Sequence, residues 1–309
     1  MSAPPSPPAH AVEAVGLVRR FGDVEALRGA SLHVTRGEIF GLVGPDGAGK
    51  TTTIRTLAGL LSRHGGEARI LGLDPLKEGH RVRESLGVMP QRYSLYGDLS
   101  IAENLDFFGR LFCLPRAVYA ERAGRLLAIT RLAPFVDRRA DALSGGMYKK
   151  LALACALLHE PSVLLLDEPT NGVDPVSRRE LWELLYRFSS EGMAVLVSTP
   201  SMDEAERCHR VGLLHEGRML CEAAPRDLIA GFDHDVFELV GGDHVALERD
   251  VPGLDGVVAS TFASARPRVV VRREGSGGLA RHANAHGASL RPAAPTFEDV
   301  FLARIAEAA

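Results

Sequence analysis

Short apolar runs alternate with longer amphipathic stretches from residue 11 to about residue 231. Short continuous apolar runs predict buried strands, and apolar residues at steps of three and four predict helices. Strands that alternate with helices in this way indicate a largely parallel sheet with helices on its faces. The predicted strands are 38–43, 86–89, 163–167 and 193–197, and the predicted helices are 51–61, 100–143 and 175–188.

The pattern changes near residue 232. Strand-like segments at 236–240 and 268–272 are separated by glycine-rich turns, and Thr296-Phe-Glu-Asp299 has the spacing of a capping box that begins a last helix. These features predict a small C-terminal α+β domain over 232–309, after a main domain over 11–231. Residues 1–10 are rich in proline and are expected to form a disordered tail.

Composition narrows the class of protein. A chain of 309 residues with 46% hydrophobic and 24% charged residues is typical of a soluble protein with about two domains. The net charge of -3 gives no reason to expect a nucleic-acid partner. No apolar run approaches the ~20 residues that span a bilayer, and residues 1–10 lack the features of a signal peptide. We therefore expect a cytoplasmic protein that reaches a membrane only through another protein.

The segment Gly44-Pro-Asp-Gly-Ala-Gly-Lys-Thr51 fits the phosphate-loop pattern G-x-x-x-x-G-K-[ST], and it lies between a predicted strand and a predicted helix. Glycines let backbone N–H groups turn toward phosphates, and the following helix presents its positive dipole end to the same anion. Lys50 is predicted to reach the β- and γ-phosphates, and the Thr51 hydroxyl to ligate Mg²⁺. The predicted nucleotide-binding residues of this segment are Gly44, Pro45, Asp46, Gly47, Ala48, Gly49, Lys50, Thr51 and Thr52.

A second chemical signal stands at the end of the predicted strand 163–167. Asp167 closes this strand and Glu168 follows it. An aspartate at a strand end beside a phosphate loop is expected to hold Mg²⁺ through water, and the adjacent glutamate to polarise an attacking water as general base. Alone, such a pair is often only a solvated strand end. Beside the phosphate loop we interpret it as catalytic.

Further motifs follow in an order that is specific to one family. Leu143-Ser-Gly-Gly-Met147 precedes a predicted helix and then Leu164-Leu-Leu-Asp-Glu-Pro169, and this series resembles the nucleotide-binding subunit of ABC transporters. The resemblance implies an α/β fold: a P-loop NTPase core with a parallel sheet, an N-terminal antiparallel β subdomain and a helical subdomain at about 92–145. The segment 294–302 looks like the tail of ABC-2-type exporter ATPases, the drug-resistance and polysaccharide-export group.

The resemblance also implies roles for residues outside the phosphate loop. Gln91 matches the family's Q-loop, which ligates Mg²⁺ and takes part in catalysis, and Asn171-Gly-Val-Asp174 matches its D-loop. Phe21 stands where the family places an aromatic side chain that stacks on adenine; the alternative is a core phenylalanine. The additional residues implied to contact nucleotide are Phe21, Asp174 and the signature residues Ser144, Gly145 and Gly146.

The mechanism implied by the resemblance needs two such domains, which sandwich two ATP molecules head to tail. Ser144 of one domain then caps the γ-phosphate that lies on Lys50 of the other. The motion passes to an ABC-2-type membrane permease through the region 92–103, so the chain is expected at the inner face of the cell membrane. A homodimer and a heterodimer with a second ABC ATP-binding domain both remain open.

One position departs from the family pattern. The family places a histidine that contacts the γ-phosphate before the segment Met202-Asp-Glu-Ala-Glu206, and this chain has Pro200 there. Proline has no side-chain donor. Two interpretations stay open: an ATP-hydrolysing subunit in which Thr199, Ser201 or a water substitutes, and a catalytically slow or regulatory subunit paired with a competent ABC ATPase.

Other interpretations rest on weaker signals. A soluble ABC protein of ribosomes or DNA is disfavoured, because the chain has one phosphate loop and the segment 91–144 has no room for a long coiled coil. His282 and His286 have an i,i+4 spacing that suits a metal, but no third ligand is near in sequence, so a solvated face is favoured. Asp98 and Glu103 are expected in a solvated or partner-facing loop.

Overall fold

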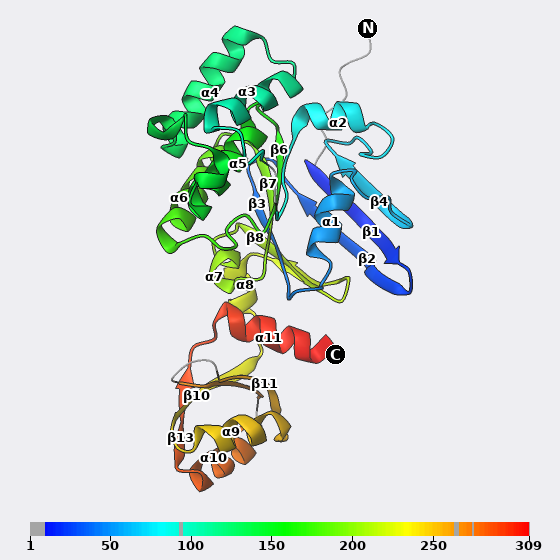
Figure 1. Ribbon diagram of the computed structural model, residues 1–309. Helices are drawn as coiled ribbons and strands as arrows, with labels where there is room; N and C mark the ends of the chain where they lie inside the picture. Colours follow the sequence, from blue (N-terminus) through cyan, green and yellow to red (C-terminus); the bar gives the residue numbers. More distant parts are fainter. Residues whose placement is uncertain (1–9, 93–94, 263–265, 274, 309) are drawn as a thin grey trace. The chain divides into compact units, whose positions relative to one another are not determined.

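The computed structural model describes residues 10–92, 95–262, 266–273 and 275–308, and these form two units that divide between Glu222 and Ala223. Figure 1 shows the elements of both units. Apart from His10, the expected tail at 1–10 lies outside the described residues. No helix in the described part of the chain combines the length and the hydropathy that a membrane crossing requires.

Six strands form the central sheet of the first unit. The strands other than the edge strand β9 run parallel to their neighbours. Every residue of the three middle strands β6, β7 and β3 is buried, as expected for apolar runs covered on both faces. The predicted parallel sheet is confirmed. Its strand order is β5 (Leu86–Met89), β6 (Val163–Asp167), β7 (Ala194–Thr199), β3 (Ile39–Val43), β8 (Arg210–His215) and β9 (Arg218–Ala223).

A smaller antiparallel sheet lies beside the first, in the order β2 (Val24–Val34), β1 (Val12–Phe21) and β4 (Gly65–Ile70). Helix α1 (Lys50–Leu57) packs against strands of both sheets and buries Ile54 and Leu57 in their common core. This confirms the expected N-terminal antiparallel subdomain. The predicted helix 51–61 was too long, because Gly59 takes a φ of 72° just after α1 and lies against the Pro75 carbonyl.

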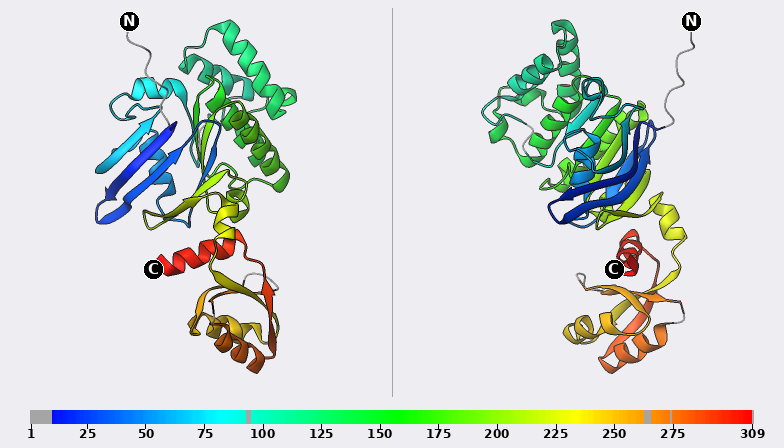
Figure 2. Two further views of the ribbon diagram at one scale, coloured as in Figure 1. Left: turned by 180° about the vertical axis from the view of Figure 1, so that it is seen from behind. Right: turned by 90° about the vertical axis from the view of Figure 1, so that its right-hand side faces the viewer.

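Helices α5 (Gly145–Leu157) and α6 (Pro175–Ser190) cover the face of the six-stranded sheet opposite α1 (Figures 1 and 2). The region predicted as helical at 100–143 contains α3 (Ile101–Leu111), α4 (Arg116–Thr130) and two short 3₁₀ turns. Glu103 lies in the first turn of α3 rather than in a loop, because it completes a capping box with Ser100. The short helices α2 (Gly79–Ser85) and α7 (Met202–Ala205) complete the first unit.

The second unit is a split βαβ fold of the ferredoxin-like kind. Its four strands form an antiparallel sheet of order β11-β12-β10-β13, and the element order is β10 (His234–Gly241), α9 (His244–Asp250), β11 (Val257–Thr261), β12 (Arg268–Arg272), α10 (Ser276–Ala285) and β13 (Ala288–Ala293). Helices α9 and α10 pack on one face of this sheet. The last helix α11 (Phe297–Ala308) and α8 (Pro225–Ala230) pack on the other (Figure 1).

The division between the units falls before α8, not at the expected boundary 231/232. The reason is packing: Leu228 and Ile229 of α8 lie against the cluster that contains Phe232, Val236 and Val300 of the second unit. The sequence pattern alone makes α8 look like the last helix of the main domain.

The capping box predicted at the start of α11 is confirmed and has an additional partner. The Asp299 N–H donates to Thr296 Oγ1 (3.3 Å), and Asp299 Oδ2 accepts from the Thr296 N–H (2.7 Å). The Arg268 guanidinium of β12 donates to both carboxylate oxygens of Asp299, at 3.2 and 2.7 Å. Asp299, which is 3% exposed, therefore joins the helix start to the sheet.

Replacing Asp299 with alanine is expected to destabilise the second unit by about 2–3 kcal/mol, because it removes a helix cap and leaves Arg268 without its main partner. Urea denaturation followed by circular dichroism measures the loss. Glu298→Ala changes the adjacent exposed carboxylate and is the matched control. Equal stability of the two variants would contradict the role assigned to Asp299.

Candidate nucleotide-binding site

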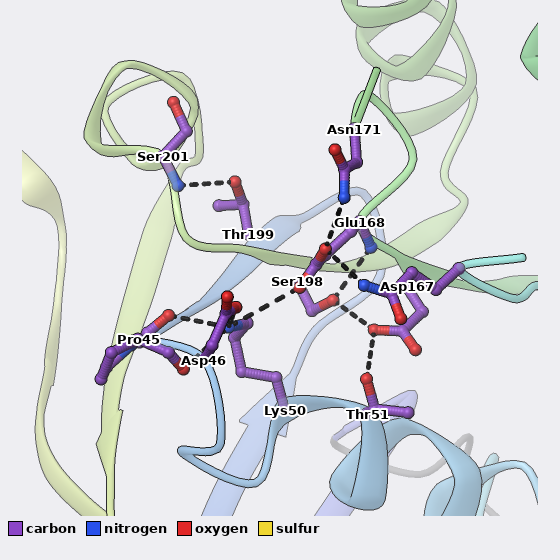
Figure 3. Close-up of polar contacts among 12 residues, drawn as sticks. Pro45, Asp46, Lys50, Thr51, Asp167, Glu168, Asn171, Ser198, Thr199 and Ser201 are labelled. Atoms are coloured by element: carbon purple, nitrogen blue, oxygen red, sulfur yellow. Dashed lines mark hydrogen bonds and ion pairs between the residues drawn. The ribbon is translucent and has the colours of Figure 1, made fainter. Parts of the chain in front are cut away.

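The carboxyl ends of parallel strands meet at one edge of the six-stranded sheet, and the predicted chemical residues follow these ends. Strand β3 leads into the phosphate loop, β5 leads to Gln91, β6 ends at Asp167 and β7 ends at Thr199. Because neighbouring parallel strands end at the same edge, Thr51 and Asp167 come into contact although 116 positions separate them. Figure 3 shows the polar contacts at this edge.

The backbone of the phosphate loop depends on its glycines. Gly47 and Gly49 have φ values of 80° and 108°, a region that L side chains rarely adopt. A Cβ at Gly44 would lie 2.2 Å from the Leu214 carbonyl oxygen, so the loop passes against β8 at this residue. A glycine-rich loop of this shape that enters a helix N-terminus presents its N–H groups to a phosphate.

Lys50 is the buried cation of the site, with 4% of its surface exposed. Its Nζ donates to the carbonyl oxygens of Gly44 (2.8 Å) and Pro45 (3.0 Å), and it lies 3.7 Å from Glu168 Oε1 (Figure 3). A buried ammonium group requires oxygen partners, and phosphate oxygens form stronger, charge-assisted bonds than carbonyl oxygens do. The geometry therefore suits the predicted contact with the β- and γ-phosphates.

Asp167 gathers two hydroxyl groups around one carboxylate oxygen. Thr51 Oγ1 donates to Asp167 Oδ1 at 3.1 Å, and Ser198 Oγ donates to the same oxygen at 2.7 Å (Figure 3). Hydroxyl and carboxylate oxygens are the ligands that Mg²⁺ prefers, so this donor set fits the predicted ion. Sequence reasoning missed Ser198. It pairs with Asp167 in the register of β6 and β7, so a strand alignment would have indicated it.

Glu168 is held by several contacts in an unusual backbone conformation. Its φ is 48°, which costs on the order of 1–3 kcal/mol in a residue other than glycine. Its N–H donates to Ser198 Oγ (3.0 Å), and its Oε2 accepts from Gln91 Nε2 (2.7 Å) and from Asn171 Nδ2 (3.2 Å). The structure thus joins the predicted catalytic pair Gln91 and Glu168, and it adds Asn171 as a positioning group.

A polar cleft of about 480 Å³ opens beside these residues. Gln91, Glu168, Pro200 and Ser201 all line it, so the proline borders the same space as the predicted general base. The cleft is large enough for the phosphate groups of a nucleotide and the water that would attack them.

The polar groups around Pro200 form hydrogen bonds with one another and with nearby residues. Thr199 Oγ1 donates to the buried Glu204 Oε2 (2.8 Å) and accepts from the Ser201 N–H (3.0 Å), and Thr170 Oγ1 donates to Glu204 Oε1. Thr199 is 1% exposed. Its hydroxyl is therefore already hydrogen-bonded within the loop, so Thr199 is not available to replace the family's histidine.

The signature residues lie at the start of α5 and contact the D-loop region. Ser144 Oγ accepts from the Met147 N–H (3.3 Å) as the helix N-cap, and a Cβ at Gly146 would lie 2.2 Å from Ser177 Oγ. Lys149 of the same helix donates to the Gln91 carbonyl (3.2 Å). In the part of the chain that the structure describes, no hydrogen bond links Ser144 to the phosphate loop of the same chain.

Two further predicted residues have distinct surroundings. Phe21 is 44% exposed and has the Arg19 guanidinium 4.6 Å above its ring, so the alternative of a core phenylalanine is wrong. Asp174 caps α6, because its Oδ1 accepts from the Ser177 and Val176 N–H groups. These bonds, chiefly the one from Ser177, lower the pKa of Asp174. The nucleotide contacts predicted for Phe21 and Asp174 remain predictions.

Comparison with known proteins agrees with this geometry. The family model of the ABC transporter matches residues 27–171. The chain is 41% identical over 293 residues to the probable multidrug ABC transporter ATP-binding protein YbhF of Escherichia coli K12, which covers 93% of this chain but only 50% of YbhF. The chain thus spans about half the length of that relative.

A second relative matches over most of both proteins. The Nod factor export ATP-binding protein I of Paraburkholderia xenovorans is 42% identical over 250 residues, which covers 80% of this chain and 82% of that protein. Among solved structures, the dimeric ATP-binding cassette MJ0796 with ADP and Pi superposes with a TM-score of 0.62 at 25% identity, over 69% of this chain and 98% of the cassette. The phosphate loop, the strand-end carboxylates and these matches together show that the chain belongs to the ATP-binding proteins of the ABC transporter family.

Proposed function

We propose that the chain is the ATP-hydrolysing subunit of an ABC exporter and couples ATP-driven dimerisation to a separate membrane permease. The observation that carries the proposal is the convergence of Lys50, Thr51, Asp167 and Glu168 at one edge of the sheet, where Glu168 also lines the polar cleft. Export is supported by the names of the relatives, a probable multidrug ABC transporter ATP-binding protein and a Nod factor export ATP-binding protein.

The residues at this edge of the sheet have different chemical roles. Lys50 binds the β- and γ-phosphates of ATP, and Thr51, Asp167 and the Gln91 side chain hold Mg²⁺, which when bound neutralises phosphate charge. Glu168 accepts a proton from the attacking water, and Gln91 and Asn171 orient its carboxylate through Oε2. Phe21 stacks on the adenine from its exposed position at the end of β1.

Two such domains are proposed to close over the nucleotides, so that Ser144, Gly145 and Gly146 of one domain complete the site of the other. Support comes from the similar cassette MJ0796, whose structure with ADP and Pi is dimeric. The N-terminus of α5, where Ser144 is the cap, then faces the γ-phosphate with its positive end. Asp174, beside this helix start, is proposed to reach the same interface.

We expect membrane association only through an ABC-2-type permease. Expressed alone, the chain is predicted to remain in the supernatant after high-speed centrifugation; expressed with its permease, it is predicted to sediment with membranes at the inner face. Quantitative blotting of both fractions measures the shift, and an unrelated ABC permease is the control. Salt-resistant sedimentation with ribosomes or DNA instead would favour the soluble ABC class.

A second candidate function is a catalytically slow or regulatory subunit paired with a competent ABC ATPase. The observation that favours it is Pro200, which lines the cleft without a donor while the neighbouring Thr199 hydroxyl is bound to Glu204. Ser201 or a water is then the remaining substitute for the missing histidine. Steady-state ATPase measurements on the purified chain separate the two candidates.

A further inference from the structure

Outside the nucleotide site, the second unit brings together two histidines and an aspartate. Asp250 is the last residue of α9, and His282 and His286 lie four positions apart at the end of α10. One ligand atom from each residue lies within 4.8 Å of the other two. Sequence reasoning found the histidine pair but no third ligand, because Asp250 is distant in sequence and becomes a neighbour only when α9 and α10 pack on the same sheet face.

The ring nitrogen Nε2 of His282 is buried without a hydrogen bond. Among the residues that the structure describes, none donates to this atom or accepts from it. Its nearest anionic group is Asp250 Oδ2 at 3.6 Å, which is too long for a hydrogen bond. Two ligands of one Zn²⁺ ion, each about 2.0–2.1 Å from the metal in a tetrahedral site, are separated by roughly 3.4 Å. The observed spacing is therefore closer to that of two metal ligands than to that of a bonded pair.

The second histidine makes the hydrogen bond that metal-binding histidines usually make. His286 Nδ1 lies 3.0 Å from the His282 carbonyl oxygen, and since a carbonyl only accepts, Nδ1 carries the proton. In a neutral ring this leaves the lone pair on Nε2. A ligating histidine almost always donates its other N–H to a carbonyl or carboxylate in this manner.

The carboxylate also has a supporting group. Arg249 Nε donates to Asp250 Oδ1 at 2.7 Å. Oδ2, the oxygen that faces His282, is bound more loosely by Arg249 Nη2 at 3.1 Å. An ion is thus able to take Oδ2 while Arg249 keeps Oδ1.

We propose that Asp250, His282 and His286 form a Zn²⁺ site that links the end of α9 to the end of α10. Two imidazoles and one carboxylate are a common zinc set, with water in the fourth position. The site is separate from the nucleotide chemistry and belongs to the second unit alone. Because each helix also buries a leucine in the core beneath (Leu247 and Leu279), the ion is expected to stabilise an arrangement that already exists.

The test is metal binding by the full-length chain. The protein is stripped with a chelator, dialysed, and titrated with Zn²⁺ in excess Mg²⁺, which occupies the oxygen sites of the nucleotide cleft. About one Zn²⁺ per chain is expected, and Co²⁺ in its place is expected to give the intense visible absorption of a four-coordinate ion. His282→Asn and His286→Asn are each expected to weaken binding by on the order of 100-fold or more.

His80→Asn is the matched control. His80 also has a carboxylate neighbour, Glu84, four positions away, but within the described part of the chain it belongs to no group of three possible metal ligands. It is expected to leave Zn²⁺ affinity unchanged. Circular dichroism checks that each variant is folded, and Asp250→Asn replaces any histidine variant that is not. Zn²⁺ affinity that is equal in wild type, His282→Asn and Asp250→Asn, or a wild-type chain that retains no Zn²⁺, overturns the proposal.

Discussion

Lys50→Ala is expected to weaken Mg·ATP binding by on the order of 10²–10³-fold, since it removes charge-assisted bonds to two phosphates in a partly desolvated site. The Lys50 side chain is 4% exposed and is already desolvated, so its charge acts on the phosphates with little screening. Equilibrium titration with a fluorescent ATP analogue measures the loss.

The control for this prediction has to separate binding from folding. Lys50→Ala also leaves the Glu168 carboxylate without the ammonium that lies 3.7 Å from it, so thermal unfolding of the variant is measured alongside. Lys77→Ala removes an exposed lysine of the same unit and is expected to bind nucleotide as the wild type does. A folded Lys50→Ala protein with wild-type affinity would contradict the phosphate-loop assignment.

The predictable elements of the fold are those whose pattern of apolar residues along the sequence matches their burial in the structure. Strands β5, β6 and β12 have the predicted bounds, because each is a short apolar run that the sheet buries. The phosphate loop is equally local: its glycines, its lysine and the helix that follows are consecutive, and the chemistry requires that spacing. Glu168 was found from its place at a strand end and Gln91 from the family pattern, and the hydrogen bond between them is an observation that no spacing supplies.

The parts that were not predictable depend on contacts between distant segments. Helix α8 has no local feature that assigns it to the second unit; the packing of Leu228 against that unit's core does. Ser198 meets Asp167 only through the register of two parallel strands. Asp250 meets His282 only because two helices share a sheet face. In each case the partner is set by tertiary packing, which periodicity along one chain does not encode.

We propose that Pro200 limits how fast this chain hydrolyses ATP at its own site. Pro200 and Glu168 both line the cleft, and the hydroxyl of the neighbouring Thr199 donates a hydrogen bond to Glu204. Losing one preorganised donor to a developing charge typically costs ~10²–10³ in rate. The loss is confined to the site built on Lys50 and Glu168. The signature at Ser144, which serves a partner's site in the proposed dimer, keeps its serine and both glycines.

If transport continues with one slow ATP site, the dimer is expected to be asymmetric, with most hydrolysis at the partner's site. In a complex with a competent partner, Glu168→Gln in this chain is expected to remove little ATPase activity, and the equivalent change in the partner most of it. Steady-state phosphate release by the reconstituted complex measures both. Equal losses from the two changes, or rapid turnover by this chain alone, would refute the asymmetry and leave a homodimer with two similar sites.

Pro200→His is expected to raise turnover at this chain's own site by roughly 10- to 100-fold, because it restores a donor where the γ-phosphate gains charge. Pro200→Ala is the decisive comparison: it frees the backbone of the loop to the same extent but adds no donor. If rigidity of the loop were the cause of slow hydrolysis, both variants would gain activity equally. If the missing donor is the cause, only the Pro200→His variant gains ATPase activity. Adding Glu168→Gln to that variant is then expected to abolish the gain, because the new donor cannot speed hydrolysis without the general base.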